Sequence, residues 1–327
     1  IPTYNRVDNL PVCLDSALSQ MFTNFEIVII DDGSTDNTEK LILENYNDSR
    51  IRYFWQEGSG SPANPRNQGI HKARGDWVSF LDSDDVWYPE KLESVYEKIQ
   101  NQPETDVICH NERFCDQTNQ KLHKISHVRI ANNMYKSMLM EGNCLSPSAT
   151  SIRKSFLTEK KLYFNESPDF AIVEDYDLWL RLAKNGAMIS FINKTLADYV
   201  VDGGNMISNW GKYINNLEYL YKFHAFTVQD FEPNKEKVFN KLIANIHLYR
   251  LKKALKEKKY LEMIYELSQS LLKSPTLLPK KLISKITNRL MISFQTPYWI
   301  AFETSYSARQ CLKFRTACAG MRSRKGD

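Results

Sequence analysis

A mainly parallel β-sheet flanked by helices, with a helical extension at the C-terminal end, is the α/β fold that this sequence of 327 residues predicts. Three observations support it. Short apolar runs alternate with amphipathic segments through roughly the first 200 residues. The run Ile27–Ile30 has no polar residue, which is typical of a strand buried on both faces. Acidic residues directly follow several of these runs, at the sheet edge where open α/β folds bind ligands.

The period of the apolar residues places the expected elements in order. A helix begins after Asp8, with an apolar stripe that starts at Leu10 and Leu14. Pro89 opens a later helix, and Gly186 follows the end of another. Strands are expected at residues 26–30, 51–55, 77–81, 106–109, 149–152, 188–192 and 195–201, and helices at residues 65–74, 174–185, 217–221 and 237–272.

The strand signal ends near Asn205, which divides the chain into an α/β domain over residues 1–210 and a helical, basic region over residues 211–327. Residues 113–133 show no clear period, so no element is assigned to them. The first residues, Ile1 and Pro2, resemble the clipped end of a strand, and we expect a few residues to precede them.

Composition is that of a soluble globular protein, with 42% hydrophobic and 25% charged residues. The six cysteines form no C-x-x-C pair and show no metal-ligand spacing, so we expect free thiols in a reducing cytoplasm. No secretory signal is found, and no apolar run reaches the roughly 18 residues that span a bilayer. The sequence therefore predicts a cytoplasmic protein.

The charge is unevenly distributed: residues 241–327 contain 18 Lys and Arg against 5 Asp and Glu, whereas residues 1–240 contain 25 against 34. A basic end on an acidic body indicates an anionic partner. One interpretation is peripheral contact with the inner face of the cytoplasmic membrane, with Leu290–Phe294 among the headgroups and Lys280 against anionic lipid. The other is a helical cap with a solvated basic face. Nucleic acid is not expected, because no binding motif accompanies the charge.

Three acidic clusters follow expected strands or begin an expected helix. They are Asp31-Asp32, the group of Asp82, Asp84 and Asp85, and Glu174-Asp175. Any one of them alone is explained by a turn or by capping of the next helix. Three clusters at one edge of a sheet would make a strongly negative surface, which favours a bound cation and a phosphorylated ligand.

Five segments in order resemble the family 2 glycosyltransferases, which have a GT-A fold and invert the anomeric centre. The resemblance covers residues 1–210. The segments are Pro2-Thr3-Tyr4-Asn5-Arg6, Asp31-Asp32-Gly33-Ser34-Thr35-Asp36, Arg66-Asn67-Gln68-Gly69 with Ala73-Arg74-Gly75, Leu81-Asp82-Ser83-Asp84-Asp85, and Glu174-Asp175-Tyr176-Asp177-Leu178-Trp179-Leu180-Arg181.

The resemblance implies a role for each matching residue. Asp31 or Asp32 would accept a hydrogen bond from the imide N–H of the base, and Asp82 would bind the ribose. Asp82 and Asp84 would bind Mn²⁺ or Mg²⁺, which bridges the diphosphate, and Asp85 would contact the sugar or support the site. The nucleotide-binding residues that the resemblance implies are Pro2, Thr3, Tyr4, Arg6, Asp31, Asp32, Arg66, Asn67 and Asp82.

The catalytic pair implied by the resemblance is Glu174 and Asp175, with Asp175 as the general base that deprotonates the acceptor hydroxyl. Burial and acidic neighbours can raise the pKa of such a carboxylate towards working pH. In one respect the sequence departs from the family. Asp202 stands where a His often completes the metal shell, so the third metal ligand is open.

The implied activity is transfer of a sugar from a nucleoside-diphosphate sugar, with a UDP-sugar as first expectation, to a hydroxyl of a glycan or lipid-linked acceptor in cell-surface polysaccharide synthesis. The alternative is a non-catalytic nucleotide-sugar-binding or scaffold protein of a glycan assembly complex, which Asp202 motivates. A sugar nucleotidyltransferase shares the sheet architecture but needs a Gly-rich loop after the first strand. Residues 2–6 are not such a loop. Donor sugar, acceptor, linkage and oligomeric state are left open.

Overall fold

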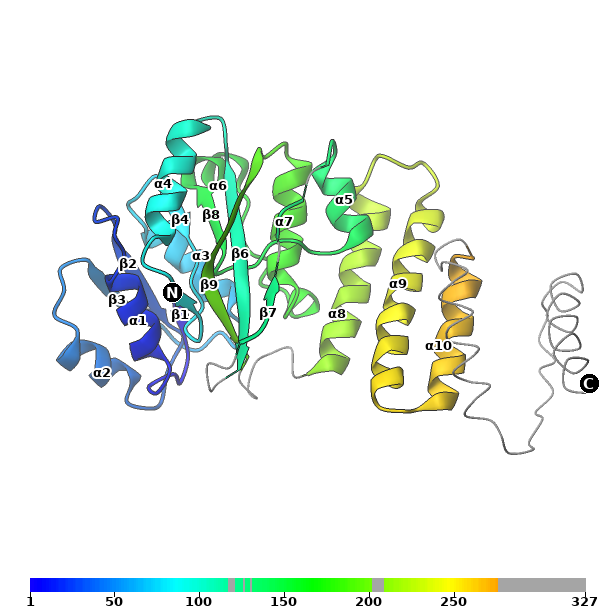
Figure 1. The fold of residues 1–327 in the computed structure, drawn as a ribbon, viewed down its shortest axis with the longest axis horizontal. Coiled ribbons are helices and arrows are strands. Elements are labelled where there is room, and N and C mark those ends of the chain that lie inside the picture. The colour runs from blue at the N-terminus through cyan, green and yellow to red at the C-terminus, as the bar shows by residue number, and fades with distance from the viewer. Residues whose placement is uncertain (117–120, 126, 130, 202–208, 276–327) are drawn as a thin grey trace, which may run out of the picture. The chain divides into compact units, whose positions relative to one another are not determined.

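The structure is a computed structural model, which describes residues 1–116, 121–125, 127–129, 131–201 and 209–275 (Figure 1). All of these residues belong to one compact unit, Ile1–Leu277. Asp202 and the basic segment from residue 276 onwards lie outside the described residues. Within the described ranges, no helix has the length and hydropathy that crossing a bilayer requires.

Three parallel strands form the N-terminal sheet, as the sequence predicted. They pair in the order β1-β2-β3, with Pro2 opposite Ile30 and Ile27 opposite Ile51. Because all three run the same way, their carboxyl ends lie at one edge, which brings Thr3 and Asp31 together. The elements of this part are β1 (Pro2–Thr3), α1 (Leu10–Leu18), β2 (Ile27–Asp31), α2 (Thr38–Asn45), β3 (Ile51–Trp55) and α3 (Ala63–Lys72).

A six-stranded mixed sheet continues the fold. Its order is β4-β8-β6-β9-β5, with β7 paired to β6. Only β6 and β9 pair in parallel; the other pairs in this sheet are antiparallel, so the parallel pairing expected for the whole fold holds for just part of it. The strands are β4 (Trp77–Ser79), β5 (Val86–Trp87), β6 (Val107–Asp116), β7 (Lys121–Ile125), β8 (Thr150–Arg153) and β9 (Ile189–Val201).

Two features of this sheet differ from the expected elements. The unassigned segment 113–133 contains the end of β6 and the strand β7, which form a hairpin with a bulge between Phe114 and Cys115. β9 is one long strand rather than two, because its pairing with β6 continues through register shifts at Asn111. Local periodicity is weak at such bulges, since an extra residue reverses the face on which the following side chains lie.

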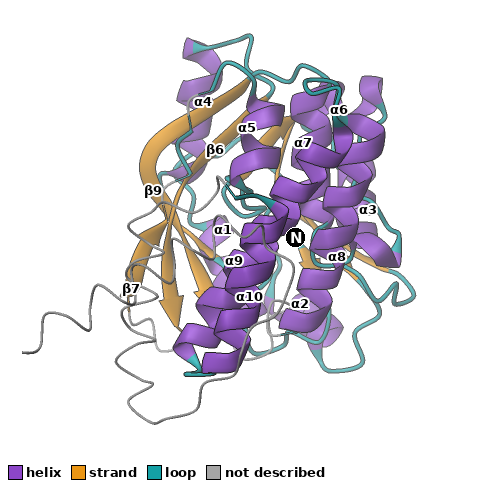
Figure 2. Ribbon diagram, turned by 90° about the vertical axis from the view of Figure 1, so that its right-hand side faces the viewer, coloured by secondary structure: helices purple, strands orange, loops and turns teal. Residues whose placement is uncertain are grey.

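Helices cover the sheets and continue beyond them as a row, in which α8, α9 and α10 follow one another (Figures 1 and 2). The expected helix 237–272 is two helices, since the chain turns at Lys258 with a φ of +59°. The remaining elements are α4 (Lys91–Asn101), α5 (Met134–Glu141), α6 (Lys154–Lys160), a 3₁₀ turn (Pro168–Phe170), α7 (Glu174–Lys184), α8 (Trp210–Phe223), a π-helical turn (His224–Val228), α9 (Lys235–Lys256) and α10 (Tyr260–Lys273).

The main hydrophobic core joins the sheet to these C-terminal helices. Trp179 of α7 is fully buried and its ring packs against Phe80 and Phe164. The same core includes Leu217 of α8 and Leu242 of α9. The helices after residue 210 are therefore packed on the α/β part of the unit. The predicted division at residue 210 stays a prediction, because residues 276–327 lie outside the described residues.

Candidate active site

A cavity of about 790 Å³ opens where the predicted site residues meet. It lies at the carboxyl ends of β1 and β2, beside the loop after β4 and the first turn of α7. Six acidic residues line it: Asp32, Asp82, Asp84, Glu112, Glu174 and Asp175. A second cavity of about 370 Å³ is lined mostly by apolar residues, including those of β2 and β4. The larger cavity is therefore the one with chemical groups for a reaction.

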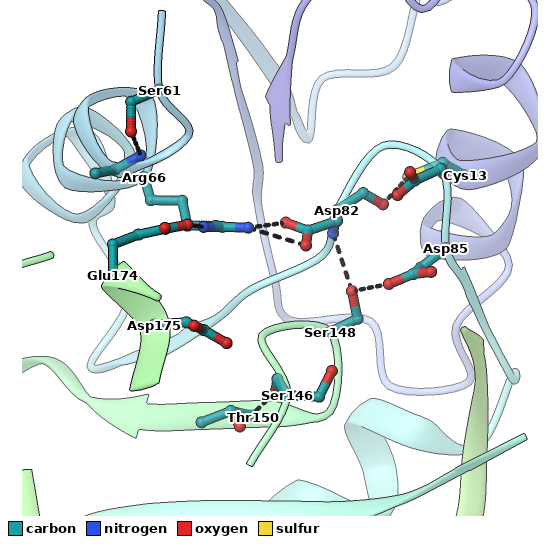
Figure 3. Close-up of polar contacts among 12 residues, drawn as sticks. Cys13, Ser61, Arg66, Asp82, Asp85, Ser146, Ser148, Thr150, Glu174 and Asp175 are labelled. Carbon is teal, nitrogen blue, oxygen red and sulfur yellow. Dashed lines mark hydrogen bonds and ion pairs between the residues drawn. The ribbon is translucent and has the colours of Figure 1, made fainter. Parts of the chain in front are cut away.

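Arg66 of α3 joins two of the acids (Figure 3). Its guanidinium donates to both carboxylate oxygens of Asp82 at 2.7 and 2.9 Å, and to Glu174 Oε1 at 2.8 Å. Only 6% of Arg66 is exposed. Burial by itself lowers the pKa of this guanidinium, but the charges of Asp82 and Glu174 outweigh that effect and raise it. Arg66 is therefore a fixed cation that holds the loop after β4 against α7.

Two buried oxygen atoms that belong to lining residues have no hydrogen-bond partner among the described residues. They are Thr3 Oγ1 at the end of β1 and Glu174 Oε2 at the start of α7. Buried polar groups in native proteins are almost always hydrogen-bonded, so such atoms in a cavity indicate that a ligand or water completes them. Both residues belong to the set that the sequence assigned to the site.

Asp84 is the second acid of the D-x-D segment, and it also lines the cavity. Its Oδ2 atom lies 3.5 Å from the guanidinium of Arg6. Among the described residues, no group of three His, Cys, Asp or Glu side chains could hold a metal ion. Oxygen ligands from one or two carboxylates, completed by substrate phosphates, nevertheless suit Mg²⁺ or Mn²⁺. Because Asp82 is bound to Arg66, Asp84 is the better placed of the two to be a ligand.

Asp85 points towards Ser148 (Figure 3). It is buried, and it is not among the residues that line the cavity. Its carboxylate accepts from Ser148 Oγ at 2.5 Å and from the Val200 N–H at 3.0 Å, and Ser148 Oγ accepts from the Asp82 N–H. Burial, with the neighbouring acids, raises the pKa of Asp85 well above its usual range. Asp85 thus orients the loop, and its sugar contact stays a prediction.

The two acids of the Asp31-Asp32 pair also differ in whether they line the cavity. Asp31 is fully buried and accepts from the Ser34 N–H and the Tyr53 hydroxyl, both at 2.8 Å. Asp32 lines the cavity, and accepts from Gln56 Nε2 at 2.6 Å and from Ser59 Oγ at 2.8 Å. Asp32 therefore faces the cavity in which a base would be bound, and a contact between Asp31 and the base stays a prediction.

Of the other residues predicted to bind the nucleotide, some line the cavity and one does not. Pro2, Tyr4 and Arg6 line the cavity. Asn67 does not, because its amide donates to the carbonyl of Phe164 at 2.9 Å and accepts from the N–H of the same residue at 2.8 Å. Asn67 therefore fixes the segment before α7, and its nucleotide contact stays a prediction.

Asp175 lies in the first turn of α7 and faces the cavity beside Glu174 (Figure 3). Its Oδ1 atom accepts from the N–H of Tyr176 at 2.6 Å. Burial, followed by the negative charge of Glu174, raises the pKa of Asp175 to about 7. A carboxyl group with a pKa near neutral pH is suited to accept and release protons.

The chain enters α7 through a strained residue. Ile172, which also lines the cavity, has a φ of +71°, in the left-handed region that β-branched residues rarely adopt. The surrounding structure must enforce this conformation, which costs about 1–3 kcal/mol. Strain of this kind is common at active sites, and here it lies three residues before Asp175.

Several residues of the cavity were missed by the sequence reasoning. Glu112 and Phe114 of β6 line it, and so do His127, Ser146 and Tyr199. Residues 112 and 114 lie on one face of a strand. If the strand expected at 106–109 had been extended to residue 114, the alternation of its side chains could have identified them. No comparable signal exists for His127, which belongs to a segment without a period.

Comparison with known proteins identifies similar sequences. The model of the Glycosyl transferase family 2 matches residues 1–163. An uncharacterized glycosyltransferase of Rickettsia felis is 31% identical over 242 residues, which are 70% of this chain and 38% of the relative. Glycosyltransferase GlyG of Streptococcus pneumoniae serotype 4 is 35% identical over 112 residues, 34% of this chain and 37% of GlyG. The aligned part of the chain thus spans well under half the length of each of these two relatives.

Solved structures share the fold at low sequence identity. Residues 1–349 of S. aureus TarS, in complex with UDP-GlcNAc, have a TM-score of 0.59 at 20% identity, over 88% of this chain and 83% of that chain. The mannosyltransferase PcManGT of Pyrobaculum calidifontis, in complex with GDP-Man and Mn²⁺, has a TM-score of 0.56 at 15% identity, over 91% and 80%. These likenesses bear out the expected GT-A fold.

Proposed function

The chain belongs to glycosyltransferase family 2, and on that premise we propose that it transfers a sugar from a nucleoside-diphosphate sugar to a hydroxyl group of a glycan or lipid-linked acceptor. The observation that carries this proposal is one cavity that brings together Asp84, Arg66 and a carboxylate, Asp175, whose pKa is about 7. The complexes of similar structures with UDP-GlcNAc and with GDP-Man support a nucleotide sugar as donor, and the first of these favours a UDP-sugar.

The reaction is a direct displacement. Asp175 accepts the proton of the acceptor hydroxyl. At the same time the oxygen of that hydroxyl attacks the anomeric carbon from the face opposite the diphosphate. The new glycosidic C–O bond forms as the bond from the anomeric carbon to the diphosphate oxygen breaks, so the anomeric centre inverts and the nucleoside diphosphate leaves. The nucleotide would be bound by residues at the ends of β1 and β2, namely Pro2, Thr3, Tyr4 and Asp32.

A divalent cation, Mn²⁺ or Mg²⁺, would supply charge neutralisation at the diphosphate, with Asp84 as its protein ligand. The guanidinium of Arg6, 3.5 Å from Asp84, is a second positive group on this side of the cavity. Arg66 acts differently, because both of its terminal nitrogens donate to acids, one to Asp82 and the other to Glu174. We therefore assign Arg66 to holding the acids rather than the phosphates.

The experiment is a screen of nucleotide sugars for Mn²⁺-dependent release of nucleoside diphosphate by the purified protein. Asp175→Asn should reduce turnover by about 10²–10⁴-fold, because the base is lost while its shape is kept. UDP affinity should stay unchanged in this variant. Asp169→Asn, the same change at an exposed position just before α7, is the matched control. UDP binding with no turnover of any nucleotide sugar would instead indicate a non-catalytic binding protein.

Contact with an anionic membrane surface is a second part of the proposal. It rests on the charge of residues 241–327, which contain 18 basic and 5 acidic residues. The full chain should co-sediment with vesicles that contain phosphatidylserine and not with pure phosphatidylcholine, and high salt should release it because the attraction is screened. Equal binding to both kinds of vesicle, or to neither, would contradict this assignment. An enzyme held there would be close to lipid-linked acceptors of cell-surface polysaccharides.

A further inference from the structure

Glu112 and His127 form a buried pair in the wall of the cavity, and the proposed displacement uses neither. Glu112 is fully buried on β6, and its Oε2 atom lies 2.8 Å from His127 Nε2. Ser146 Oγ donates to the other carboxylate oxygen of Glu112, at 3.3 Å. All three residues line the cavity. They come from β6, from the segment after β7 and from the loop before β8, so three separate elements hold them in place.

Hydrogen bonding fixes the charge of this pair. His127 Nδ1 lies 3.0 Å from the carbonyl oxygen of Cys144, which can only accept, so Nδ1 carries a proton. Nε2 faces Glu112, and one more proton lies between the ring and the carboxylate. Whether that proton is on the nitrogen or on the oxygen, the pair has no net charge. This part of the cavity is therefore suited to an uncharged ligand, in contrast to the acidic part around Asp82 and Asp84.

An aromatic and apolar wall surrounds the pair. The rings of Phe114 and Tyr199 are stacked, with centroids 5.2 Å apart and an angle of 23° between their planes. Both residues line the cavity, and so do three smaller apolar residues, Ile125, Leu145 and Pro147. A sugar ring has apolar C–H faces and hydroxyl groups at its edge. An aromatic surface beside the hydroxyl group of Ser146 matches both parts of such a ring.

We propose that Glu112, His127 and Ser146 form a subsite for an uncharged, hydroxyl-bearing sugar ring, with Phe114 and Tyr199 against its apolar face. The inference rests on the proposed function and deepens it. Ser146 is partly exposed, and its Oγ atom accepts from a sugar hydroxyl while it donates to Glu112. The fully buried Glu112, held by His127, orients that serine. A sugar with a carboxylate or phosphate at this position is disfavoured, because the Glu112–His127 pair has no net positive charge with which to compensate the anion. The ring belongs either to the donor or to the acceptor, and the test distinguishes the two.

The test compares Glu112→Gln and Ser146→Ala with the wild type. Glu97→Gln, the same change on the exposed face of α4, is the matched control. Affinities are measured for UDP, which has no sugar, and for the UDP-sugar that the wild type hydrolyses fastest among UDP-glucose, UDP-galactose and UDP-GlcNAc. Transfer from that donor to a panel of neutral p-nitrophenyl glycosides gives KM and kcat for the acceptor. Thermal unfolding reports whether each variant is folded.

Ser146→Ala should leave UDP affinity unchanged and weaken sugar binding by about 10-fold, and Glu112→Gln, which disturbs the orientation of that serine, should have a smaller effect on sugar binding. If the ring is the donor's, the affinity for the UDP-sugar falls. If it is the acceptor's, that affinity and donor hydrolysis stay unchanged, and the acceptor KM rises. The inference is overturned if both variants keep wild-type values in both arms, or if UDP affinity falls as much as UDP-sugar affinity. A wild type that turns over no donor in the screen of nucleotide sugars overturns the proposed function itself.

Discussion

The Nε2 atom of His224 lies 3.1 Å from the Oδ1 atom of Asp177, and both side chains are fully buried. Asp177 is on α7, two residues after Asp175, whereas His224 follows the last turn of α8. The other ring nitrogen of His224 lies 3.2 Å from the hydroxyl of Tyr135 on α5. This contact joins the helix that carries the proposed base to the C-terminal helices, so those helices help to position α7.

Replacing His224 by Phe should lower the free energy of unfolding by about 3 kcal/mol, because it leaves one oxygen of Asp177 buried without its partner. Arg181 still contacts the other oxygen, at 2.7 Å. Urea unfolding measures the effect. His71→Phe is the control, since His71 is exposed on α3 and its ring packs beside that of Tyr163. Equal losses in the two variants would mean that the Asp177–His224 contact contributes nothing specific.

The turnover of the enzyme should depend on pH through Asp175. Because a general base must be ionised to accept a proton, and its pKa is about 7, kcat should rise with pH up to about 7 and then become constant. Below that pH the slope of log kcat against pH should approach one. A profile of kcat from pH 5 to pH 9 at saturating donor measures both the slope and the pH at which kcat becomes constant. A flat profile from pH 5 upwards would show that Asp175 is not the titrating group.

The raised pKa of Asp175 also makes this residue destabilising to the folded protein at neutral pH. The folded-state pKa of about 7 lies above the value of 3.8 for an unperturbed Asp, so the folded state binds the proton more tightly. The stability of the wild type should therefore fall as pH rises from about 4 to 7 and stay constant above. Asn keeps the oxygen that accepts from Tyr176, and cannot ionise. Asp175→Asn should gain roughly 1–3 kcal/mol over the wild type at pH 8 and little at pH 4.

Denaturant unfolding of both proteins at the two pH values measures this difference. Asp169→Asn, at an exposed position, should show no pH-dependent gain. A stabilisation of the Asp175 variant that is the same at pH 4 and pH 8 would show that it does not come from the ionisation of this residue.

Metal removal should separate Asp84 from the other acids of the site. With Mn²⁺ present, Asp84→Asn should weaken UDP binding by about 10-fold or more, because a ligand of the bridging cation is lost. In EDTA, the variant and the wild type should bind UDP with the same weaker affinity. Calorimetric titration under both conditions provides the comparison. An equal loss of affinity with Mn²⁺ and with EDTA would indicate that Asp84 contacts the nucleotide without a metal.

Local patterns predicted the elements whose side chains alternate regularly. The helix of Leu10 and Leu14 and the helix of Asp175 have a complete apolar period, the strand Ile27–Ile30 is an unbroken apolar run, and each was confirmed. The hairpin of β6 and β7 was not predicted, because the bulge after Phe114 interrupts the alternation. A pattern that spans a few residues cannot report a shift in register.

Spacing likewise identified the acidic clusters but not the direction of each side chain. Asp84 and Asp85 are neighbours in sequence, yet the first lines the cavity and the second supports the loop from behind. Asp31 and Asp32 differ in the same way at the end of β2. The direction of each side chain depends on how the chain turns after a strand. That turn is determined by contacts with segments that are distant in sequence. Glu112 was missed for a related reason, since its partners come from other elements.

The two contacts of Arg66 differ greatly in the length of chain between the partners. Asp82 is 16 residues away in sequence, whereas Glu174 is 108 residues away. Closing a long loop costs more entropy, so the second contact forms later in folding, and during synthesis it must wait until α7 has been made. Asp175 arrives on that same helix. A partly synthesised chain that ends before α7 therefore lacks both the second partner of Arg66 and the proposed base, and so it cannot turn over a nucleotide sugar by the proposed reaction.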